Sequence, residues 1–327
     1  MIKILFNTLL GIVLIFIWSR FVNLEEIFQT ILKVNPINLG PIFLFMLLSP
    51  IIRALRLKIF LSEIKKIPLK NLIFLNGAAL MLNFFIPIRA GEIAKGVYLN
   101  TKFGLNLGKS VVWIFLDRFV DFLVVLILSA GLLLVIPTSL SITIIIFITI
   151  ILSIALGLTY LAIFQANFTK KIIIFLKHLF IEKHIKIYFE RFSHLILDSF
   201  SILRRHPKDL LLIMFITILA YAADAAIWYF TFLSLEVNME FLKMYLGQLL
   251  SALTYLVPAA PGYVGSAEAS GSLILTGMFG IDVNLASAMI VLFHILSALF
   301  VLVFGLISIY NLKINLGSIL KRALKRN

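Results

Sequence analysis

Several apolar runs in this chain are longer than the ~18 residues that a helix needs to cross a lipid bilayer. Two of them, 141–164 and 284–311, contain no Asp, Glu, Lys or Arg. Because the bilayer core offers no water to backbone groups, such runs fold as helices that satisfy their own hydrogen bonds. Charged residues make up 13% of the chain, about half their share in soluble domains. The sequence therefore predicts an all-α polytopic membrane protein with a single membrane domain over 1–327.

The apolar runs divide into full spans and shorter segments. The first run resembles a signal peptide, but no small-residue cleavage site precedes Arg20, so we expect it to be retained. Two segments, about 70–105 and 241–280, are too short per arm for two crossings, and we expect re-entrant or broken-helix hairpins there. The six full spans are expected near 3–20, 37–60, 110–136, 141–164, 209–235 and 284–311.

The two short segments are interrupted in the same way. In each, an apolar half-helix ends at a proline, a glycine-containing bend follows, and a glutamate comes next. Interrupted apolar segments in corresponding halves of a membrane protein are typical of the central site of a transporter. The first break contains Asn83, Pro87, Gly91 and Glu92, and the second contains Thr254, Pro258, Pro261, Gly262, Gly265 and Glu268.

The distribution of Lys and Arg predicts how the chain lies in the membrane. Cytoplasmic loops have an excess of these residues. The 53–70 region, the 165–209 region and the tail after Leu312 are rich in them, whereas 137–141 and 236–240 contain none. We therefore expect a multi-pass protein of the plasma (inner) membrane with both termini in the cytoplasm. The basic segment 168–206 is expected to be an amphipathic connector at the inner surface.

This orientation predicts an internal repeat. The segments 1–136 and 137–327 have the same order of spans and hairpin, but they cross the membrane in opposite directions. Such an inverted repeat allows one central site to face either side of the membrane in turn. The match between Asn83 and Thr254, each four residues before a proline, favours the repeat over a chance result of charge parity.

Ionisable residues inside predicted spans are candidate functional residues because they are costly to place in a bilayer. Asp117 and Asp121 are four residues apart and share a helix face, while Arg118 and Asp121 are spaced to form an ion pair. The group either locks this helix to a neighbour or contacts cargo or a proton directly. Asp224 and His294 lie within other spans and are either functional groups or satisfied core residues.

The first break has the composition of an anion site. A helix that starts after Gly91 presents free N–H groups, and the fork of Arg89 suits phosphate. Glu92 either takes part in this site or only caps the helix. At the second break, a buried Glu268 either takes up a proton or balances Arg89. Near the inner end of the second span, Arg53 and Arg56 either bind cargo or extend to lipid headgroups. The candidate substrate-binding residues are Arg53, Arg56, Asn83, Arg89, Glu92, Asp117, Arg118, Asp121, Asp224, Pro261, Gly262, Glu268 and His294.

Several classes of function are disfavoured by the sequence. The chain has no cysteine, so thiol chemistry and disulfides are excluded. No nucleotide-binding, metalloprotease or serine hydrolase motif is present, and we expect neither an enzyme nor a bound cofactor or metal. The net charge of +14 comes from residues beside the apolar runs, so it indicates contact with anionic headgroups rather than with nucleic acid.

Four motifs resemble those of a known family. They are Arg53-Ala54-Leu55-Arg56, Asn83-x-x-x-Pro87-x-Arg89-x-Gly91-Glu92-x-x-Lys95, Asp117-Arg118-x-x-Asp121 and Pro258-x-x-Pro261-Gly262-x-x-Gly265-x-x-Glu268. Together they resemble the transmembrane (flippase) domain of lysylphosphatidylglycerol synthases, which also occurs alone in flippase-like membrane proteins. The resemblance covers nearly the whole chain. One departure is His294, which stands where the family often has an arginine.

The resemblance implies a domain that moves a polar-headed lipid between membrane leaflets. In bifunctional members a further soluble domain transfers lysine to phosphatidylglycerol. The present chain ends at Asn327 without one, so we do not expect it to make the lipid. Stand-alone members are also linked to polyprenyl-phosphate metabolism, so the expected partner is a membrane lipid of either type. Two alternatives stay open: a polytopic lipid-linked glycosyl or headgroup transferase or its accessory subunit, and a structural partner that recruits a lipid-modifying enzyme. A homo-oligomer is compatible with each reading.

Overall fold

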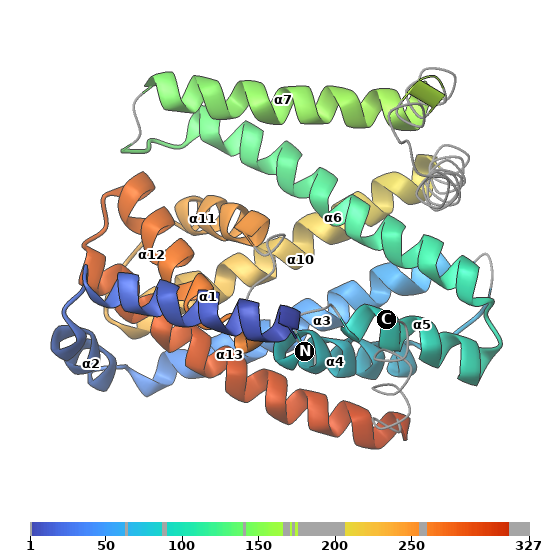
Figure 1. The fold of residues 1–327 in the computed structure, drawn as a ribbon, viewed down its shortest axis with the longest axis horizontal. Helices are drawn as coiled ribbons and strands as arrows, with labels where there is room; N and C mark the ends of the chain where they lie inside the picture. The colour runs from blue at the N-terminus through green and yellow to red at the C-terminus, as the bar shows by residue number, and fades with distance from the viewer. Residues whose placement is uncertain are drawn as a thin grey trace.

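All elements that the computed structural model describes are helices, as the all-α prediction requires (Figure 1). The described residues are 2–62, 65–86, 90–139, 142–165, 171, 174–175, 207–254 and 260–313. The helices are α1 (Ile2–Ser19), α2 (Leu24–Leu32), η1 (Pro36–Asn38), α3 (Leu39–Ser62), α4 (Leu69–Phe85), α5 (Ala90–Phe103), α6 (Leu107–Val135), α7 (Ile142–Phe164), α10 (Pro207–Ser234), α11 (Phe241–Thr254), η2 (Pro261–Tyr263), α12 (Ser266–Phe279) and α13 (Val283–Leu312).

The centre of the molecule is formed by helices that are distant in sequence. Helix α3 packs along α10, α4 along α13, and α11 against α6. One apolar core lies between α3, α4, α6 and α10, and a second lies between α3, α10 and α13. Glycines allow α4 and α13 to approach closely, because a Cβ on Gly77 would lie 2.2 Å from Ser308 and one on Gly305 would lie 2.4 Å from Met81. Helix α7 lies at one edge of the molecule, beside α6 (Figure 1).

Long apolar helices and an apolar exterior identify a membrane protein. Three stretches are long and apolar enough to cross a bilayer, namely Leu116–Val135, Lys208–Ser234 and Val283–Leu312. A fourth is added if the pair Thr8–Ser19 and Leu24–Leu32, bent by 89°, counts as one span. Large apolar side chains such as Leu302 and Ile307 of α13 are exposed, as expected of a surface that faces lipid.

The six predicted spans are thus matched only in part. Helix α3 occupies the span predicted near 37–60, but its interior contains Arg53, Arg56 and Lys58, so it is less apolar than a simple span. Helix α7 occupies the span predicted at 141–164, and its part from Ile145 to Leu158 is a shorter apolar stretch. The count of six therefore stays a prediction.

Both predicted hairpins are broken helices. The first one stops at Phe85 and restarts at Ala90, and the second stops at Thr254 and restarts at Ser266. Pro87, Arg89 and Pro258, which were expected to shape the breaks, lie outside the described residues, as does nearly all of the 168–206 connector. Helices α5 and α12, which follow the two breaks, lie toward opposite ends of the molecule (Figure 1).

Each break is shaped by glycine. A Cβ on Gly91 would lie 2.1 Å from the carbonyl oxygen of Ala79, so only glycine lets α5 start this close to α4. At the second break Gly262 and Gly265 have φ angles of 70° and 82°, in the left-handed region that favours glycine. The oxygen of Gly11 in α1 would lie 2.2 Å from a Cβ on Gly265, so α1 presses directly on this bend. Both bends are therefore closely packed by neighbouring helices.

Candidate functional site

A cavity lined by both charged and apolar side chains lies in the middle of the bundle. Its volume is about 440 Å³, and its walls come from α3, α4, α5, α6, α10, α11, α12, α13 and η2. A cavity of this size falls in the range of pockets that bind small ligands. Of the predicted site residues, those that line the cavity are Arg53, Asn83, Glu92, Arg118, Asp121, Asp224 and His294.

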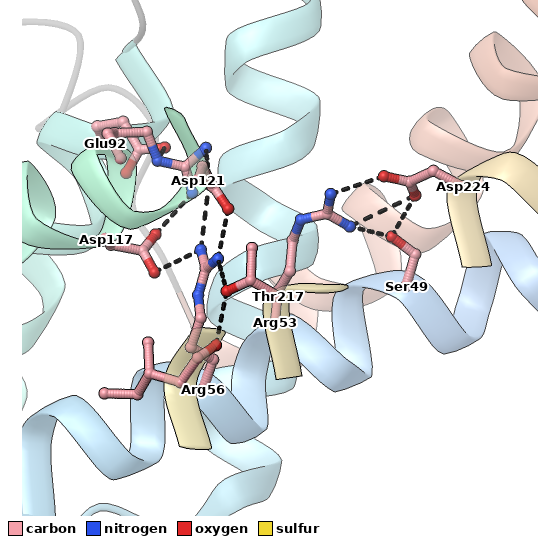
Figure 2. Close-up of polar contacts among 10 residues, drawn as sticks. Ser49, Arg53, Arg56, Glu92, Asp117, Asp121, Thr217 and Asp224 are labelled. Atoms are coloured by element: carbon pink, nitrogen blue, oxygen red, sulfur yellow. Dashed lines mark hydrogen bonds and ion pairs between the residues drawn. The ribbon is translucent and has the colours of Figure 1, made fainter. Parts of the chain in front are cut away.

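Arg56 is the centre of a buried ion cluster beside the cavity (Figure 2). It is 1% exposed, and its Nη2 lies 2.6 Å from Asp117 Oδ1. The same guanidinium donates to both oxygens of Asp121 and, at 2.9 Å, to Thr217 of α10. A charge this deeply buried is stable only when it is paired and hydrogen-bonded. The cluster therefore ties α3, α6 and α10 together.

The cluster continues to the cavity through Arg118. Its Nη2 donates to Asp117 Oδ2 at 2.6 Å, and its Nη1 lies 3.1 Å from Asp121 Oδ2. These contacts confirm the ion pair expected from the spacing of Arg118 and Asp121. The Nε of Arg118 lies 3.9 Å from Glu92 of α5, and Glu92 lies 3.5 Å from the ammonium of Lys95. The Arg118 side chain is 36% exposed, so it faces the cavity while holding its partners.

Arg53 forms a separate pair on the cavity wall. Its Nη2 lies 2.6 Å from Asp224 Oδ2 of α10, and Ser49 Oγ donates to Asp224 Oδ1 at 2.6 Å. The guanidinium also donates to Ser49 and lies 5.3 Å from the ring centre of Tyr221. The two side chains of the ion pair are 21% and 19% exposed. Figure 2 shows this pair beside the Arg56 cluster.

These contacts bear on two alternatives that the sequence leaves open. Asp224, expected to be either a functional group or a satisfied core residue, pairs with Arg53 because α3 and α10 pack side by side. Extension of Arg53 and Arg56 to lipid headgroups was the alternative to cargo binding, but both side chains turn inward to carboxylates of α6 and α10. The partners of these side chains depend on which helices pack together, and local sequence pattern does not reveal that.

A third polar group joins the second break to α13. Glu268 Oε2 accepts a hydrogen bond of 2.7 Å from the backbone N–H of Gly265, as a capping glutamate does. Its other oxygen contacts His294 Nδ1, and His294 Nε2 lies 2.6 Å from the carbonyl oxygen of Gly262. Among the described residues Glu268 thus pairs with His294, while its expected balance with Arg89, which lies outside them, stays a prediction. Pro261 begins η2, the short turn that places Gly262.

At the first break the backbone is held by Asn83. Its Oδ1 accepts a hydrogen bond of 2.8 Å from the N–H of Gly91, which ties the end of α4 to the start of α5. The candidate Arg89 lies outside the described residues, so its phosphate contact stays a prediction. Glu92 serves more than its own helix, since it reaches both Lys95 and Arg118.

Several residues of the site were not among the predicted ones. Ser49 precedes Arg53 by one helical turn, and Lys95 follows Glu92 by three residues, so helical spacing was an available signal for both. Thr217 gave no such signal, because its partner Arg56 is 161 residues away. The cavity also has aromatic walls, which include Phe84, Phe122, Tyr221, Trp228, Tyr263 and Phe293.

Comparison with known proteins places the chain in a family. No curated protein and no solved structure matches it. A family model described as "Lysylphosphatidylglycerol synthase TM region" matches residues 4–305, which contain all four motifs and the whole cavity. Since this match covers most of the chain, the protein belongs to the family of the lysylphosphatidylglycerol synthase TM region.

Proposed function

We propose that this protein is a lipid flippase-like transporter, not an enzyme, that moves a phosphate-containing lipid between the leaflets of the plasma membrane. The proposal rests above all on the cavity of about 440 Å³ inside an apolar helix bundle, which has charged side chains on its wall and lies between two broken hairpins. The family name adds a link to phosphatidylglycerol lipids. The cargo is a phosphatidylglycerol-type or polyprenyl-phosphate-type lipid, and both termini of the protein are cytoplasmic.

The charges around the cavity suit a headgroup that exchanges partners with the protein. Three cations, Arg56, Lys95 and Arg118, are balanced by the three carboxylates of Glu92, Asp117 and Asp121. A phosphate that enters takes the place of Glu92 against Lys95 and Arg118, which line the cavity. Arg56 and Asp117 stay paired behind them and keep the helices together.

The proposal includes the inverted repeat of 1–136 and 137–327. In this repeat α3 corresponds to α10, α4 to α11, α5 to α12 and α6 to α13. The contact of α4 with α13 then corresponds to the contact of α11 with α6, and the contact of α3 with α4 corresponds to that of α10 with α11. The contact of α5 with α6 likewise becomes that of α12 with α13, while α3 and α10 exchange with each other. Such exchange is expected from a two-fold axis in the membrane plane.

Side chains at the centre support the same repeat. A shift of 168 residues carries Ser49 to Thr217 and Arg56 to Asp224. The hydrogen bond of Arg56 with Thr217 then corresponds to that of Asp224 with Ser49. The outer helices differ, since α1 packs on α12 whereas α7 packs on α6. The repeat therefore concerns the helices that surround the cavity.

Lipid movement in proteoliposomes tests the function. The assay compares fluorescent phosphatidylglycerol with a fluorescent polyprenyl-phosphate, for wild type and for Lys95→Met. Loss of one charge-assisted hydrogen bond to phosphate should slow transport about tenfold. Lys102→Met, on the same helix but exposed, is the matched control and should match wild type.

The outcomes separate the candidate functions. Movement that depends on Lys95 supports the transporter, and the preferred lipid identifies the cargo class. Protein that is folded by size-exclusion chromatography but moves neither lipid contradicts the transporter. In that case the transferase or accessory-subunit reading becomes the better one.

A further inference from the structure

The two hairpins place a glutamate–cation pair in equivalent positions. Glu92 is the third residue of α5, and Glu268 is the third residue of α12. Their partners, Arg118 and His294, are each the twelfth residue of the following long helix. The pairs therefore agree in construction but differ in the cation. An arginine keeps its charge at every physiological pH, whereas a histidine exchanges its proton in that range.

The contacts of His294 determine how many protons it holds with Glu268. The carbonyl oxygen of Gly262 only accepts hydrogen bonds, so His294 Nε2 bears a hydrogen. The contact of His294 Nδ1 with Glu268 Oε1 then needs one more proton between them. This proton lies either on the ring, giving imidazolium and carboxylate, or on the carboxyl group, giving two neutral partners. Without it, two lone pairs face each other and the contact breaks.

We propose that Glu268 and His294 form a proton-binding site whose occupancy decides whether the second break is held to α13. The inference deepens the proposed function, because it assigns a proton as the coupling ligand of the same cavity. With the proton bound, Glu268 joins the start of α12 to α13 while capping the N–H of Gly265. When the proton leaves, Glu268 keeps its cap but loses α13, and the bend is free to move.

The surroundings make this pair the main group that exchanges a proton here. Helix α4 contributes Asn83 and Phe84, and the Phe84 ring lies 6.1 Å from the His294 ring. Lys3 is the only ionisable residue of α1, which packs on α12. Helix α2 meets α13 at its first turn, where Glu26 accepts from Asn284. The charged and titratable groups that face the same cavity are Arg53, Glu92, Lys95, Arg118, Asp121, Tyr221, Asp224 and Tyr263.

Those charged groups are already neutralised by one another. Arg53 is paired with Asp224, Glu92 with Lys95 and Arg118, and Asp121 with Arg56. Glu92 therefore stays charged and paired with Arg118 and Lys95 over the pH range in which the contact of Glu268 with His294 changes. Among the described residues of the two breaks, we therefore expect those of the second one to respond to proton loading.

Nuclear magnetic resonance on the full chain in lipid nanodiscs tests proton binding directly. With ¹⁵N-labelled histidine, the His294 signal is identified by its absence in His294→Gln among the five histidines of the chain. We expect Nε2 to be protonated throughout, and the Nδ1 signal to change between about pH 5 and 9, because Nδ1 loses either its proton or the hydrogen bond from the carboxyl group. In Glu268→Gln this change should move by at least about one pH unit. A proton on Nδ1 with a bare Nε2, or no change in this range, would overturn the proposal.

A pH gradient across proteoliposomes tests the coupling. If one proton accompanies each lipid, a difference of one pH unit changes the final lipid ratio about tenfold. His294→Arg restores the cation of the first break but cannot exchange a proton, so the gradient should no longer affect the ratio. Lys102→Met should respond like wild type.

The experiments distinguish failure of the proton coupling from failure of the proposed transport function. Lipid movement that ignores the gradient in wild type overturns the coupling but leaves the transporter intact. Absence of lipid movement overturns the transporter, while the resonance titration still decides whether the pair binds a proton.

Discussion

Arg56 and Arg53 lie three residues apart on α3, but their surroundings differ (Figure 2). Arg56 is 1% exposed and is held by two carboxylates and a hydroxyl group. Arg53 has one carboxylate partner, Asp224, and its side chain is 21% exposed on the cavity wall. The first arrangement joins three helices, whereas the second leaves part of the guanidinium accessible to a ligand.

Burial of a charge in a membrane bundle is therefore not by itself evidence of function. A buried cation whose two Nη groups are both held by protein side chains has little left to offer a cargo, and its removal leaves its carboxylates short of positive charge. A cation that shares a cavity wall with aromatic rings can change partners at lower cost. We therefore expect Arg56 to serve stability, and Arg53 and Asp224 to contact the headgroup of the proposed lipid.

The largest effect is expected from Arg56→Met. The substitution leaves Asp117 and Asp121 buried with Arg118 as their remaining charged partner, and loss of one member of a buried ion pair costs about 3–5 kcal/mol. We expect a large drop in the midpoint of thermal unfolding, measured on purified protein in detergent, and poor recovery of folded protein. A variant that unfolds like wild type would contradict the assignment of Arg56 to stability.

A smaller effect on stability and a larger one on transport are expected from Asp224→Asn. The partly exposed Arg53 keeps Ser49 and the ring of Tyr221 as neighbours, so the fold should persist. The orientation of Arg53 in the cavity changes, because an amide is a weaker partner than a carboxylate. We expect lipid movement in proteoliposomes to fall about tenfold, the effect of one charge-assisted hydrogen bond.

A charge exchange sharpens this second test. The double variant Arg53→Asp with Asp224→Arg retains an ion pair between α3 and α10 but reverses its direction. If the pair acts only by holding the helices, the double variant should transport like wild type. If the pair contacts the headgroup, transport should stay low although the unfolding midpoint recovers.

The sequence indicated which charged and polar residues form the site, but for most of them it did not indicate which residues they pair with. Period and length placed the long helices and both breaks, and helical spacing was sufficient for the pair of Arg118 with Asp121. The partner of Arg53 is 171 residues away, and that of Glu268 is 26 residues away across a turn. Such pairs depend on which helices cross and at what height. Local pattern does not contain that information.

The number of spans shows the same limit. Helix α3 is long enough to cross a bilayer, but its arginines make it more polar than an ordinary span. Carboxylates of α6 and α10 pair with these arginines and make such a helix tolerable at the centre of the bundle. Hydropathy counts the arginines as unfavourable in a bilayer, but it does not include the carboxylates that pair with them.

The smallest effects are expected from the two hydroxyl groups that α3 and α10 exchange. Thr217→Val removes the hydroxyl beside Arg56 and keeps its shape, and it should cost about 1 kcal/mol of stability without slowing transport. Ser49→Ala removes the hydroxyl between Arg53 and Asp224, and it should slow transport severalfold with little change in unfolding. Both are measured by thermal unfolding and lipid movement on the same preparations. If the two variants gave the same pattern, the distinction between a structural and a ligand-facing arginine on α3 would be lost, because each hydroxyl accepts from one of the two arginines.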